Sequence, residues 1–304
     1  MAKIKVILNP IAGKGAGQVL KPEIETYLKG IGLEFDLTQT DKIGHGIDLA
    51  QEAARNKFDI LVAAGGDGTV NEIINGLMHS KRKGHRLPAL AVLPIGRGND
   101  FAFGMGVPKL WQDAAQALVK AERHALDIGI AKSEYFPDGR YFGNGVGIGF
   151  DAVVGFVAAK SKLTGFMAYL VAAIKTIFLY FHAPTIKLEL DDQIITQPCL
   201  MVSIMNGRRM GGTFMMAPDS KHDDGVFDLC IAGQVSRLGI FALIPHFMKG
   251  DQAGHKAVKT VRSRKVVATA VKGTLPAHAD GETLCEEGHQ VSIELLPAEL
   301  DIII

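Results

Sequence analysis

The chain of 304 residues has little of three things that would place it in a specialised class. Its three cysteines, Cys199, Cys230 and Cys285, lack the spacing of a metal site and are too few for a disulfide framework, which favours the reducing cytoplasm. Its net charge is only +1, which argues against a protein that binds nucleic acid over its whole surface, because phosphate contacts need a basic excess. Low-complexity tracts and internal repeats are also absent.

Uninterrupted apolar runs are short as well. Residues 163–181 have about the length of a membrane span, but Lys175 lies inside this segment and Lys160 and Lys162 precede it. We therefore expect a buried or half-buried helix, whose lysines face either solvent or the anionic headgroups of a membrane. The first apolar run stops at Asn9, too early for a signal peptide, and is typical of a strand.

What is present is enough apolar sequence for a sizeable core, because 47% of the residues are hydrophobic and 21% are charged. Up to about residue 125, apolar strand-like runs alternate with helical patterns. Continuous apolar strands are buried on both faces, which predicts an open, mostly parallel sheet with helices on each side. The expected strands are 3–10, 33–40, 58–66 and 88–96, and the expected helices are 18–29, 45–56, 69–79 and 110–121.

The pattern changes near residues 121–128. Strand-like pieces then follow one another, interrupted by helical stretches at about 152–182 and 236–249. Consecutive strands with turn signals predict a β-rich, mostly antiparallel sandwich. We expect a first domain over 1–125 and a second over 126–297, and we allow residues 298–304 to return to the first.

Glycine-rich loops follow three of the expected parallel strands, at the edge of such a sheet where ligands bind. The first is residues 9–17, where glycines permit close approach of an anion and Lys14 adds charge. A flexible turn is the alternative for this loop. The full spacing of a P-loop is missing.

The second loop places Gly65, Gly66 and Gly68 around Asp67 at the end of a buried strand, more glycine than a turn requires. Asp67 is a candidate Mg²⁺ ligand, and Thr69 either caps the next helix or contacts phosphate. The third loop contains Gly96 and Gly98 around a cationic residue and continues into two polar residues: Arg97, Asn99 and Asp100. Arg97 suits a phosphate and Asn99 suits a helix cap. Two carboxylates on neighbouring strand ends favour a Mg–nucleotide site.

These blocks, in this order, resemble the diacylglycerol kinase catalytic-domain family, which includes bacterial diacylglycerol kinases and relatives that phosphorylate sphingosine and ceramide. The resemblance rests on 9–13, 65–72 and 94–102, and it continues through 143–152, 216–229 and 279–282. Residues 65–69 alone are shared with NAD kinases. One departure is Arg97, where the family usually has threonine.

The resemblance implies a nucleotide-binding α/β domain, a β-rich lipid-substrate domain and an active site in the cleft between them. ATP would transfer its γ-phosphate to a lipid hydroxyl, with diacylglycerol as the favoured acceptor. The implied catalytic residues are Asp280 as general base, Glu282 as its support, and Asp67 as a rival base. The implied nucleotide-binding residues are Asn9, Gly13, Lys14, Gly65, Gly66, Gly68, Thr69, Glu72, Gly96, Arg97, Gly98, Asn99 and Asp100.

The resemblance also implies two cation sites. Asp67 and Asp100 would hold catalytic Mg²⁺, and a loop with Lys221, Asp224 and Val226 would hold a structural Mg²⁺ or Ca²⁺, unless it is a plain Asp-Gly turn. The expected partners are ATP and a lipid at the membrane surface, without nucleic acid and with a homodimer left open. The alternatives are an NAD kinase, a kinase of phosphatidylglycerol or a sphingoid base, and a non-catalytic binding protein.

Overall fold

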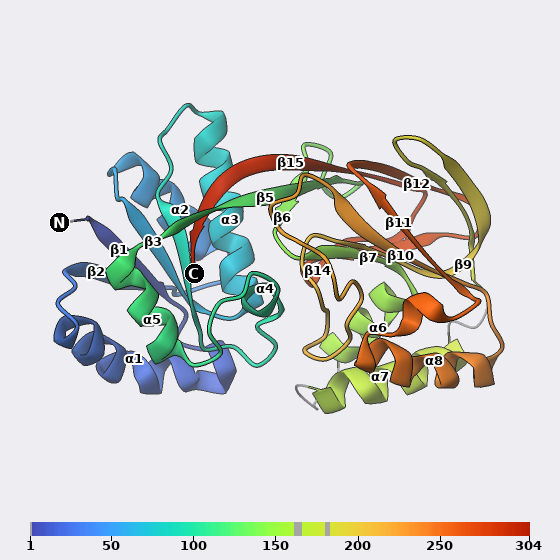
Figure 1. The fold of residues 1–304 in the computed structure, drawn as a ribbon, viewed down its shortest axis with the longest axis horizontal. Helices are drawn as coiled ribbons and strands as arrows, with labels where there is room; N and C mark the ends of the chain where they lie inside the picture. The colour runs from blue at the N-terminus through green and yellow to red at the C-terminus, as the bar shows by residue number, and fades with distance from the viewer. Residues whose placement is uncertain (1, 161–165, 180–182) are drawn as a thin grey trace. The chain divides into compact units, whose positions relative to one another are not determined.

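The computed structural model describes residues 2–160, 166–179 and 183–304, so Lys162 and part of the expected helix at 163–181 lie outside the described residues. The chain divides into two compact units (Figure 1). Unit 1 comprises Met1–Asp127 and Ala298–Ile304, and unit 2 comprises Ile128–Pro297. In the part that is described, none of the helices combines the length and the apolar character that a membrane crossing needs.

Unit 1 alternates strands and helices, as the sequence predicts. Its strands are β1 (Ile4–Leu8), β2 (Phe35–Gln39), β3 (Ile60–Gly65) and β4 (Ala89–Pro94), together with the first residues of β5 (Arg123–Lys132) and the last residues of β15 (Gln290–Ile303). Its helices are α1 (Ala12–Gly30), α2 (His45–Arg55), α3 (Asp67–Arg82), α4 (Asp100–Gly104) and α5 (Trp111–Lys120).

The sheet of unit 1 has the order β2-β1-β3-β4-β15, and the pairs from β2 to β4 are parallel. Every residue of β1, β3 and β4 is buried, which explains their continuous apolar sequences. The chain moves outward from β1 to β2 and then reverses through β3 to β4. The strand order therefore switches direction between β1 and β3, the place where open α/β sheets bind ligands.

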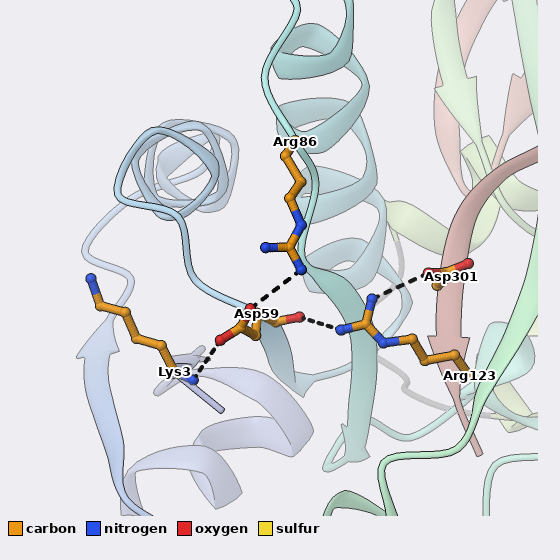
Figure 2. A network of polar contacts seen from close by, with 5 residues as sticks. All are labelled: Lys3, Asp59, Arg86, Arg123 and Asp301. Atoms are coloured by element: carbon orange, nitrogen blue, oxygen red, sulfur yellow. Dashed lines mark hydrogen bonds and ion pairs between the residues drawn. The ribbon is translucent and has the colours of Figure 1, made fainter. Parts of the chain in front are cut away.

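A polar network at the amino ends of these strands holds the opposite edge of the sheet (Figure 2). The Asp59 carboxylate accepts a hydrogen bond from the backbone N–H of Lys3 at 2.9 Å and contacts the Arg86 guanidinium at 3.4 Å. Arg123 bonds the Asp59 carbonyl oxygen at 3.2 Å and contacts Asp301 of β15 at 3.3 Å. These charges are thus used within the scaffold of unit 1, away from its glycine loops.

Unit 2 is built mainly from antiparallel strands. In sequence order, after the end of β5, they are β6 (Arg140–Phe142), β7 (Gly145–Gly149), β8 (Thr185–Glu189), β9 (Ile194–Met205), β10 (Phe227–Gly233), β11 (Val258–Ser263), β12 (Lys265–Lys272), β13 (Leu275–Ala279) and β14 (Glu282–Gly288), followed by the start of β15. The antiparallel path β14-β13-β7-β9-β8-β12-β15 carries β10 and β11 beside β9. This arrangement confirms the predicted change from an α/β to a β-rich fold.

Three helices cover part of unit 2: α6 (Phe150–Ala159), α7 (Phe166–Leu179) and α8 (Arg237–Lys249); a short 3₁₀ helix spans Gln252–Gly254. The expected single helix at 152–182 is therefore two helices in the described residues. An apolar core that includes Leu200, Met205 and Ile240 lies among strands β9 and β10 and these helices. The three cysteines are buried free thiols, and burial raises the pKa of Cys199 to about 11 and that of Cys230 to about 12.

Candidate active site

The three glycine loops of unit 1 contact one another at the carboxyl ends of β1, β3 and β4. The Asn9 side-chain amide, after β1, donates a hydrogen bond of 3.0 Å to Thr69 Oγ1, in the first turn of α3. This bond crosses the point where the strand order reverses. Thr69 therefore does not cap α3 with its side chain; its hydroxyl faces the loop after β1, where a phosphate would approach the free N–H groups of the helix.

Contact between the loops is close because glycine occupies the meeting points. The N–H groups of Ile95 and Gly96 both donate to the Gly65 carbonyl, at 2.9 and 3.2 Å. A Cβ placed on Gly96 would lie 2.5 Å from Gly66 Cα, and one on Gly13 would lie 2.5 Å from the Ile95 carbonyl oxygen. Only residues without a side chain allow these backbones to touch, so the glycines predicted from the sequence serve a common structure.

The loop after β1 also contains an unusual backbone turn. Gly13, Lys14 and Gly15 have φ values of 59°, 64° and 91°, which interrupt the helical path of α1 near its start. Lys14 is exposed on this turn, and Arg97 is exposed on the loop after β4. Two cations therefore flank the contacting glycine loops, which is the charge that a nucleotide phosphate group requires.

Asp67 and Asp100 converge beside Gly98. A Cβ on Gly98 would lie 3.1 Å from Asp67 Oδ2 and 3.8 Å from Asp100 Oδ2, so the two oxygens face the same small region. Asp67 Oδ1 accepts a 2.9 Å hydrogen bond from the Phe101 backbone N–H, which holds this carboxylate at the start of α4. Two carboxylate oxygens that face one region fit the preference of Mg²⁺, which is usually bound by one or two carboxylates together with phosphates.

Asn99 occupies the N-cap position of α4, but its side chain makes no capping bond. Instead its amide nitrogen donates to the Gly96 carbonyl at 2.9 Å, and its backbone is left-handed with φ 52°. Its Oδ1 is buried and accepts no hydrogen bond. The predicted capping role is therefore wrong, and Asn99 fixes the shape of the loop after β4.

Glu72, which the resemblance assigns to nucleotide binding, holds a neighbouring helix. Its two carboxylate oxygens accept hydrogen bonds from the N–H groups of Gly44 and Gly46, at 2.7 and 2.8 Å, at the start of α2. A carboxylate at a helix N-terminus satisfies free N–H groups and favours the helix dipole. The nucleotide contact of Glu72 stays a prediction, and its structural role is evident.

In unit 2, Asp280 occupies the tight turn between β13 and β14. Asp280 and Gly281 have φ values of 49° and 86°, as a two-residue hairpin turn with positive φ at both positions requires. The carboxylate of Asp280 also accepts backbone hydrogen bonds of 2.9, 3.1 and 2.9 Å from Gly143, Asn144 and Gly145. The turn and the carboxylate are thus one unit that organises the segment leading into β7.

Glu282, the first residue of β14, is half-exposed and lies 3.6 Å from the Arg140 guanidinium. An ion pair at that distance and exposure is weak. The support of Asp280 by Glu282 stays a prediction; the hydrogen bonds described above join the Asp280 carboxylate to backbone N–H groups of the segment 143–145.

A pocket in unit 2 lies between β9, α6, α7 and α8. Its walls are apolar except for Asp151 at the start of α6, and they include Val154, Met201, Phe214 and Phe247. Asp151 Oδ2 is buried without a hydrogen bond, 3.6 Å from His278 Nε2. A single carboxylate in an apolar wall can bind the polar end of an otherwise apolar ligand.

His278 connects this carboxylate to the turn of Asp280. Its Nδ1 accepts a hydrogen bond of 3.3 Å from the Gly281 backbone N–H, which leaves the proton of the neutral ring on Nε2, toward Asp151. The pair fills the space above Gly147, where a Cβ would lie 2.2 Å from Asp151 Oδ2 and 2.5 Å from His278 Nε2.

Two family models cover nearly the whole chain. The diacylglycerol kinase catalytic domain matches residues 3–131, and the YegS C-terminal NAD kinase beta sandwich-like domain matches residues 144–304. Residues 3–131 thus match a diacylglycerol kinase catalytic domain, and the chain belongs to the family of the YegS C-terminal NAD kinase beta sandwich-like domain, whose model covers more than half of it. It is therefore a kinase, and ATP is the substrate that this family implies.

Relatives in the diacylglycerol kinase family extend over most of the chain. A diacylglycerol kinase of Bacillus subtilis (strain 168) is 27% identical over 287 residues, which are 93% of this chain and 90% of that one. One of Staphylococcus saprophyticus is 25% identical over 92% of this chain and 88% of the other. A candidate diacylglycerol kinase of Bacillus anthracis str. Sterne has a similar structure, with a TM-score of 0.80, 25% identity and coverage of 99% and 94%.

An NAD kinase of Archaeoglobus fulgidus shares the fold alone, at 13% identity, a TM-score of 0.51 and coverage of 99% and 93%. This shared fold agrees with the sequence, in which residues 65–69 are common to NAD kinases and diacylglycerol kinases. The blocks that separate diacylglycerol kinases from NAD kinases in the sequence, 94–102 and 279–282, contain the Asn99 loop and the Asp280 turn described above.

In the loop expected to hold a structural cation, the one expected side-chain ligand is Asp224, and this carboxylate has a protein partner. Asp224 forms an ion pair with Arg262 of β11, and the same guanidinium lies 3.2 Å from Asp228 Oδ1. Asp228 and Arg262 are directly opposite each other in the β10–β11 pair. Burial raises the pKa of Asp228, and the Arg262 charge opposes that shift. The described residues contain no group of three His, Cys, Asp or Glu side chains arranged for a metal.

Asp151 and His278 were missed at the level of sequence. A signal exists for His278, because it lies in β13 only two positions before Asp280 of the following turn. Asp151 lies within the block 143–152 that carries the family resemblance, but nothing local distinguishes it from an ordinary acidic residue in the first turn of a helix.

Proposed function

We propose that this protein transfers the γ-phosphate of ATP to the hydroxyl of a lipid, with diacylglycerol as the principal acceptor and phosphatidic acid as the product. The observation that carries the proposal is the pocket of unit 2, whose apolar walls contain one buried carboxylate, that of Asp151. The space inside it is about 60 Å³, enough for the polar end of a lipid and the first carbons beside it but not for whole acyl chains. Its apolar lining suits such a lipid end better than the polar acceptor of an NAD kinase.

Nucleotide binding is assigned to unit 1. The phosphates of ATP would lie against the loops of Gly66 and Gly96 and the start of α3, with Lys14 and Arg97 as cationic partners. Asn9 and Thr69 would align the first two loops through their hydrogen bond. Asp67 and Asp100 would hold Mg²⁺, which neutralises charge on the transferred phosphoryl group when it is bound.

In the proposed reaction the lipid oxygen forms a bond to the γ-phosphorus while the bond to the ADP oxygen breaks, and the hydroxyl proton passes to a carboxylate. Asp280 is our candidate for that carboxylate. Three backbone N–H groups donate hydrogen bonds to this carboxylate, an arrangement that favours the ionised form, which can accept a proton. Asp67 remains the alternative.

Asp151 and His278 are proposed to orient the polar end of the lipid. Asp151 Oδ2 accepts no hydrogen bond, so it can accept one from a hydroxyl or amine of the substrate. His278 would orient Asp151 and link it, through the hydrogen bond from Gly281, to the turn that holds Asp280. This arrangement allows a sphingoid base as well as diacylglycerol, whereas phosphatidylglycerol would bring its phosphate toward a carboxylate.

A structural Mg²⁺ or Ca²⁺ at Lys221, Asp224 and Val226 is also retained as a proposal. A cation there would share Asp224 with the Arg262 guanidinium, which already neutralises this carboxylate. No step of the reaction depends on this loop.

The function is tested with purified protein, Mg²⁺ and ATP labelled at the γ-phosphate. The acceptors are diacylglycerol, phosphatidylglycerol, sphingosine, ceramide, undecaprenol and NAD, and the products are resolved by mass. We expect label in phosphatidic acid. Label found in NADP alone would replace the proposal by an NAD kinase, and absence of transfer to every acceptor would favour a non-catalytic binding protein.

The two candidate bases are separated by Asp280→Asn and Asp67→Asn, with the exposed Asp113→Asn as a control. If Asp280 is the base, its variant loses about 10²–10⁴ in kcat while the KM for ATP is retained. Asp67→Asn should instead raise the KM for ATP and the Mg²⁺ requirement. Near-normal turnover of Asp280→Asn would transfer the role of base to Asp67.

A further inference from the structure

The loop after β9 carries two adjacent arginines in unit 2. Strand β9 ends at Met205, and the next residues are Asn-Gly-Arg-Arg-Met-Gly-Gly, over 206–212, which we call the arginine loop. Arg208 and Arg209 are both half-buried. A charged side chain that is partly removed from water needs an opposite charge or a hydrogen-bond acceptor, so the surroundings of this loop indicate what it binds.

Asn144 joins the arginine loop to the turn of Asp280. Its carbonyl oxygen accepts hydrogen bonds from the N–H groups of Asn206 and Gly207, at 2.9 and 2.8 Å, and its side-chain amide donates to the Arg209 carbonyl at 3.0 Å. Its own backbone N–H donates to the Asp280 carboxylate at 3.1 Å. One residue thus contacts both the arginine loop and our candidate base.

The contact between Asn144 and the arginine loop is tightly fixed. A Cβ placed on Gly207 would lie 2.1 Å from Asn144 Oδ1, so only glycine fits. The Asn206 side-chain amide donates to the Gly143 carbonyl at 2.8 Å, and the Ser220 hydroxyl donates to the Asn206 carbonyl at 3.2 Å. Asn206 and Ser220 are both buried. The start of the arginine loop is therefore held against the segment that binds the candidate base.

The other end of the arginine loop is a wall of the apolar pocket. Met210 and Phe214 pair with each other in an isolated β-bridge, and the two glycines that follow Met210 have φ values of 65° and 78°. Met210, Gly211 and Phe214 line the pocket that contains Asp151. The two arginines therefore occupy the stretch of chain between the candidate base and the pocket assigned to the polar end of the lipid.

The Arg208 side chain is anchored through one of its nitrogens. Its Nε donates to the Ser220 carbonyl at 3.3 Å, and its backbone carbonyl accepts a hydrogen bond of 3.1 Å from the Ala217 N–H. A guanidinium has five N–H donors, and the bond to Ser220 uses one of them. The planar fork of the remaining donors matches the oxygens of a phosphate.

A lipid phosphate in this part of unit 2 would meet two carboxylates, that of Asp151 in the pocket and that of Asp280 in its turn. Like charges repel strongly where little water separates them. Among the described residues that line the pocket, none is a lysine or an arginine. The arginine loop therefore supplies the cations that a phosphate between the pocket and the Asp280 turn requires.

We propose that Arg208 binds the phosphoryl group as it reaches the lipid oxygen and retains it in the product, while Arg209 adds positive charge beside it. The ligand of this site is the monoester phosphate of a phosphorylated lipid. The guanidinium donates hydrogen bonds to the non-bridging oxygens, and the arginine neither gains nor loses a proton. The identity of the ligand rests on the proposed lipid kinase function.

Binding is measured by calorimetric titration of the full chain with soluble short-chain lipids, without nucleotide. We expect phosphatidic acid to bind at least about tenfold more tightly than diacylglycerol of the same chain length, because its phosphate accepts charge-assisted hydrogen bonds. Arg208→Gln should remove this difference. Inorganic phosphate should bind more weakly than phosphatidic acid, since it makes no apolar contact in the pocket.

Two results of this titration would overturn the proposal. Equal affinity of the unchanged protein for diacylglycerol and phosphatidic acid would mean that no phosphate site lies beside the pocket. Equal affinity for inorganic phosphate and phosphatidic acid would mean that the loop binds a free anion and not the lipid product. Both comparisons use the unchanged protein, so they hold even where a variant fails to fold.

Turnover separates a phosphate contact from a structural one. Arg208→Gln should lower kcat on diacylglycerol about 10²–10³-fold, with the KM for diacylglycerol and the affinity for ADP unchanged within about twofold. Arg208→Lys keeps the charge without the fork and should recover part of kcat. The matched control is Arg264→Gln, because Arg264 Nε donates to the Leu295 carbonyl at 3.3 Å, the same kind of bond that Arg208 makes. This control should leave kcat unchanged.

The outcomes distinguish the phosphate site from the function on which it rests. Thermal unfolding checks that each variant is folded. A folded Arg208→Gln protein with the kcat and the phosphatidic acid affinity of the unchanged protein would show that the phosphate site is wrong and leave the kinase function standing. An unchanged protein that phosphorylates no lipid would contradict the proposed function, whereas preferential binding of phosphatidic acid that is lost in Arg208→Gln would still support the site.

Discussion

At the scale of single residues, the candidate site depends on where side chains are missing. Gly96 follows β4 and lies against Gly66, which follows β3, so the two loops meet through their backbones. Asn99 then uses its amide to hold the Gly96 carbonyl. The backbone N–H groups available to a phosphate are therefore set by this close contact.

Gly96→Ala tests that contact. The added methyl group would lie 2.5 Å from both Gly66 Cα and Asn99 Oδ1, so the loops must separate. We expect ATP affinity to fall at least about tenfold, with a loss of about 1–3 kcal/mol in the free energy of unfolding, as for other overpacked sites. Calorimetric titration and urea unfolding measure the two effects. Gly30→Ala, where nothing lies within 4 Å, is the control and should change neither.

Arg262 offers a second test at this scale, through pH. Its guanidinium attracts Asp228 and Asp224 only when these carboxyls are ionised. Because burial raises the pKa of Asp228, its ionised form is favoured less in the folded protein than in the unfolded chain, and its contribution to stability falls as pH rises above about 3.8. Arg262 offsets this fall.

We therefore expect Arg262→Gln to lower the free energy of unfolding by about 1 kcal/mol at pH 7 and by less at pH 4, where a larger share of Asp228 is protonated because its pKa is raised. Urea unfolding at the two pH values measures the difference, and Lys256→Gln serves as the control for an exposed cation in unit 2. An equal loss at both pH values would mean that Arg262 stabilises the protein through packing and not through charge.

At the scale of elements, the helices behind the glycine loops are joined by a side chain of the loop motif itself. Glu72, in the second turn of α3, bonds the first N–H groups of α2. A motif residue thus couples the helix that starts at the phosphate site to the helix beside it. This answers why a carboxylate follows the glycines at that spacing.

Glu72→Ala should remove both bonds and the charge at the start of α2. We expect a loss of about 1–3 kcal/mol in the free energy of unfolding, since two backbone donors are left without a partner. Hydrogen exchange should increase most in residues 41–50. Glu52→Ala, an exposed residue on α2, is the control. If exchange rises equally over all of unit 1, the bond stabilises the unit as a whole and not α2 in particular.

Sequence reasoning could predict these elements where the cause is local. The strands β1, β3 and β4 and the glycine loops after them follow from apolar runs and from the spacing of glycines. The left-handed turn at Gly13–Gly15 was not predicted, because any Gly-rich stretch allows it. The partners of Asp280 are 135–137 residues away in the chain, and no local pattern encodes them. The pairing of Arg262 with Asp224 has the same cause.

At the scale of the whole molecule, the chain passes between its two units twice. β5 leads from unit 1 into unit 2, and β15 leads back, so that Ala298–Ile304 complete unit 1. In this last segment Leu300, Ile302 and Ile303 are buried, and Ile302 pairs with Leu90 of β4. Unit 1 thus owes part of its core to the last residues of the sequence.

Ile302→Ala should reduce the stability of unit 1 by about 2–5 kcal/mol, the usual cost of truncating a fully buried aliphatic residue. Hydrogen exchange should rise in β3 and β4 before it rises in unit 2. Ile194→Ala, at a position of 64% exposure in unit 2, should be nearly neutral. Uniform exchange over both units would indicate that they unfold as one cooperative body.

The late return of β15 has a consequence for synthesis on the ribosome. Residues 1–127 emerge first, but the strand that covers the outer edge of β4 emerges only after all of unit 2 has been translated. During that interval the nascent unit 1 has an unpaired edge in a sheet whose strands are apolar on both faces. We therefore expect the newly made chain to need chaperone protection until residues 298–304 have left the exit tunnel.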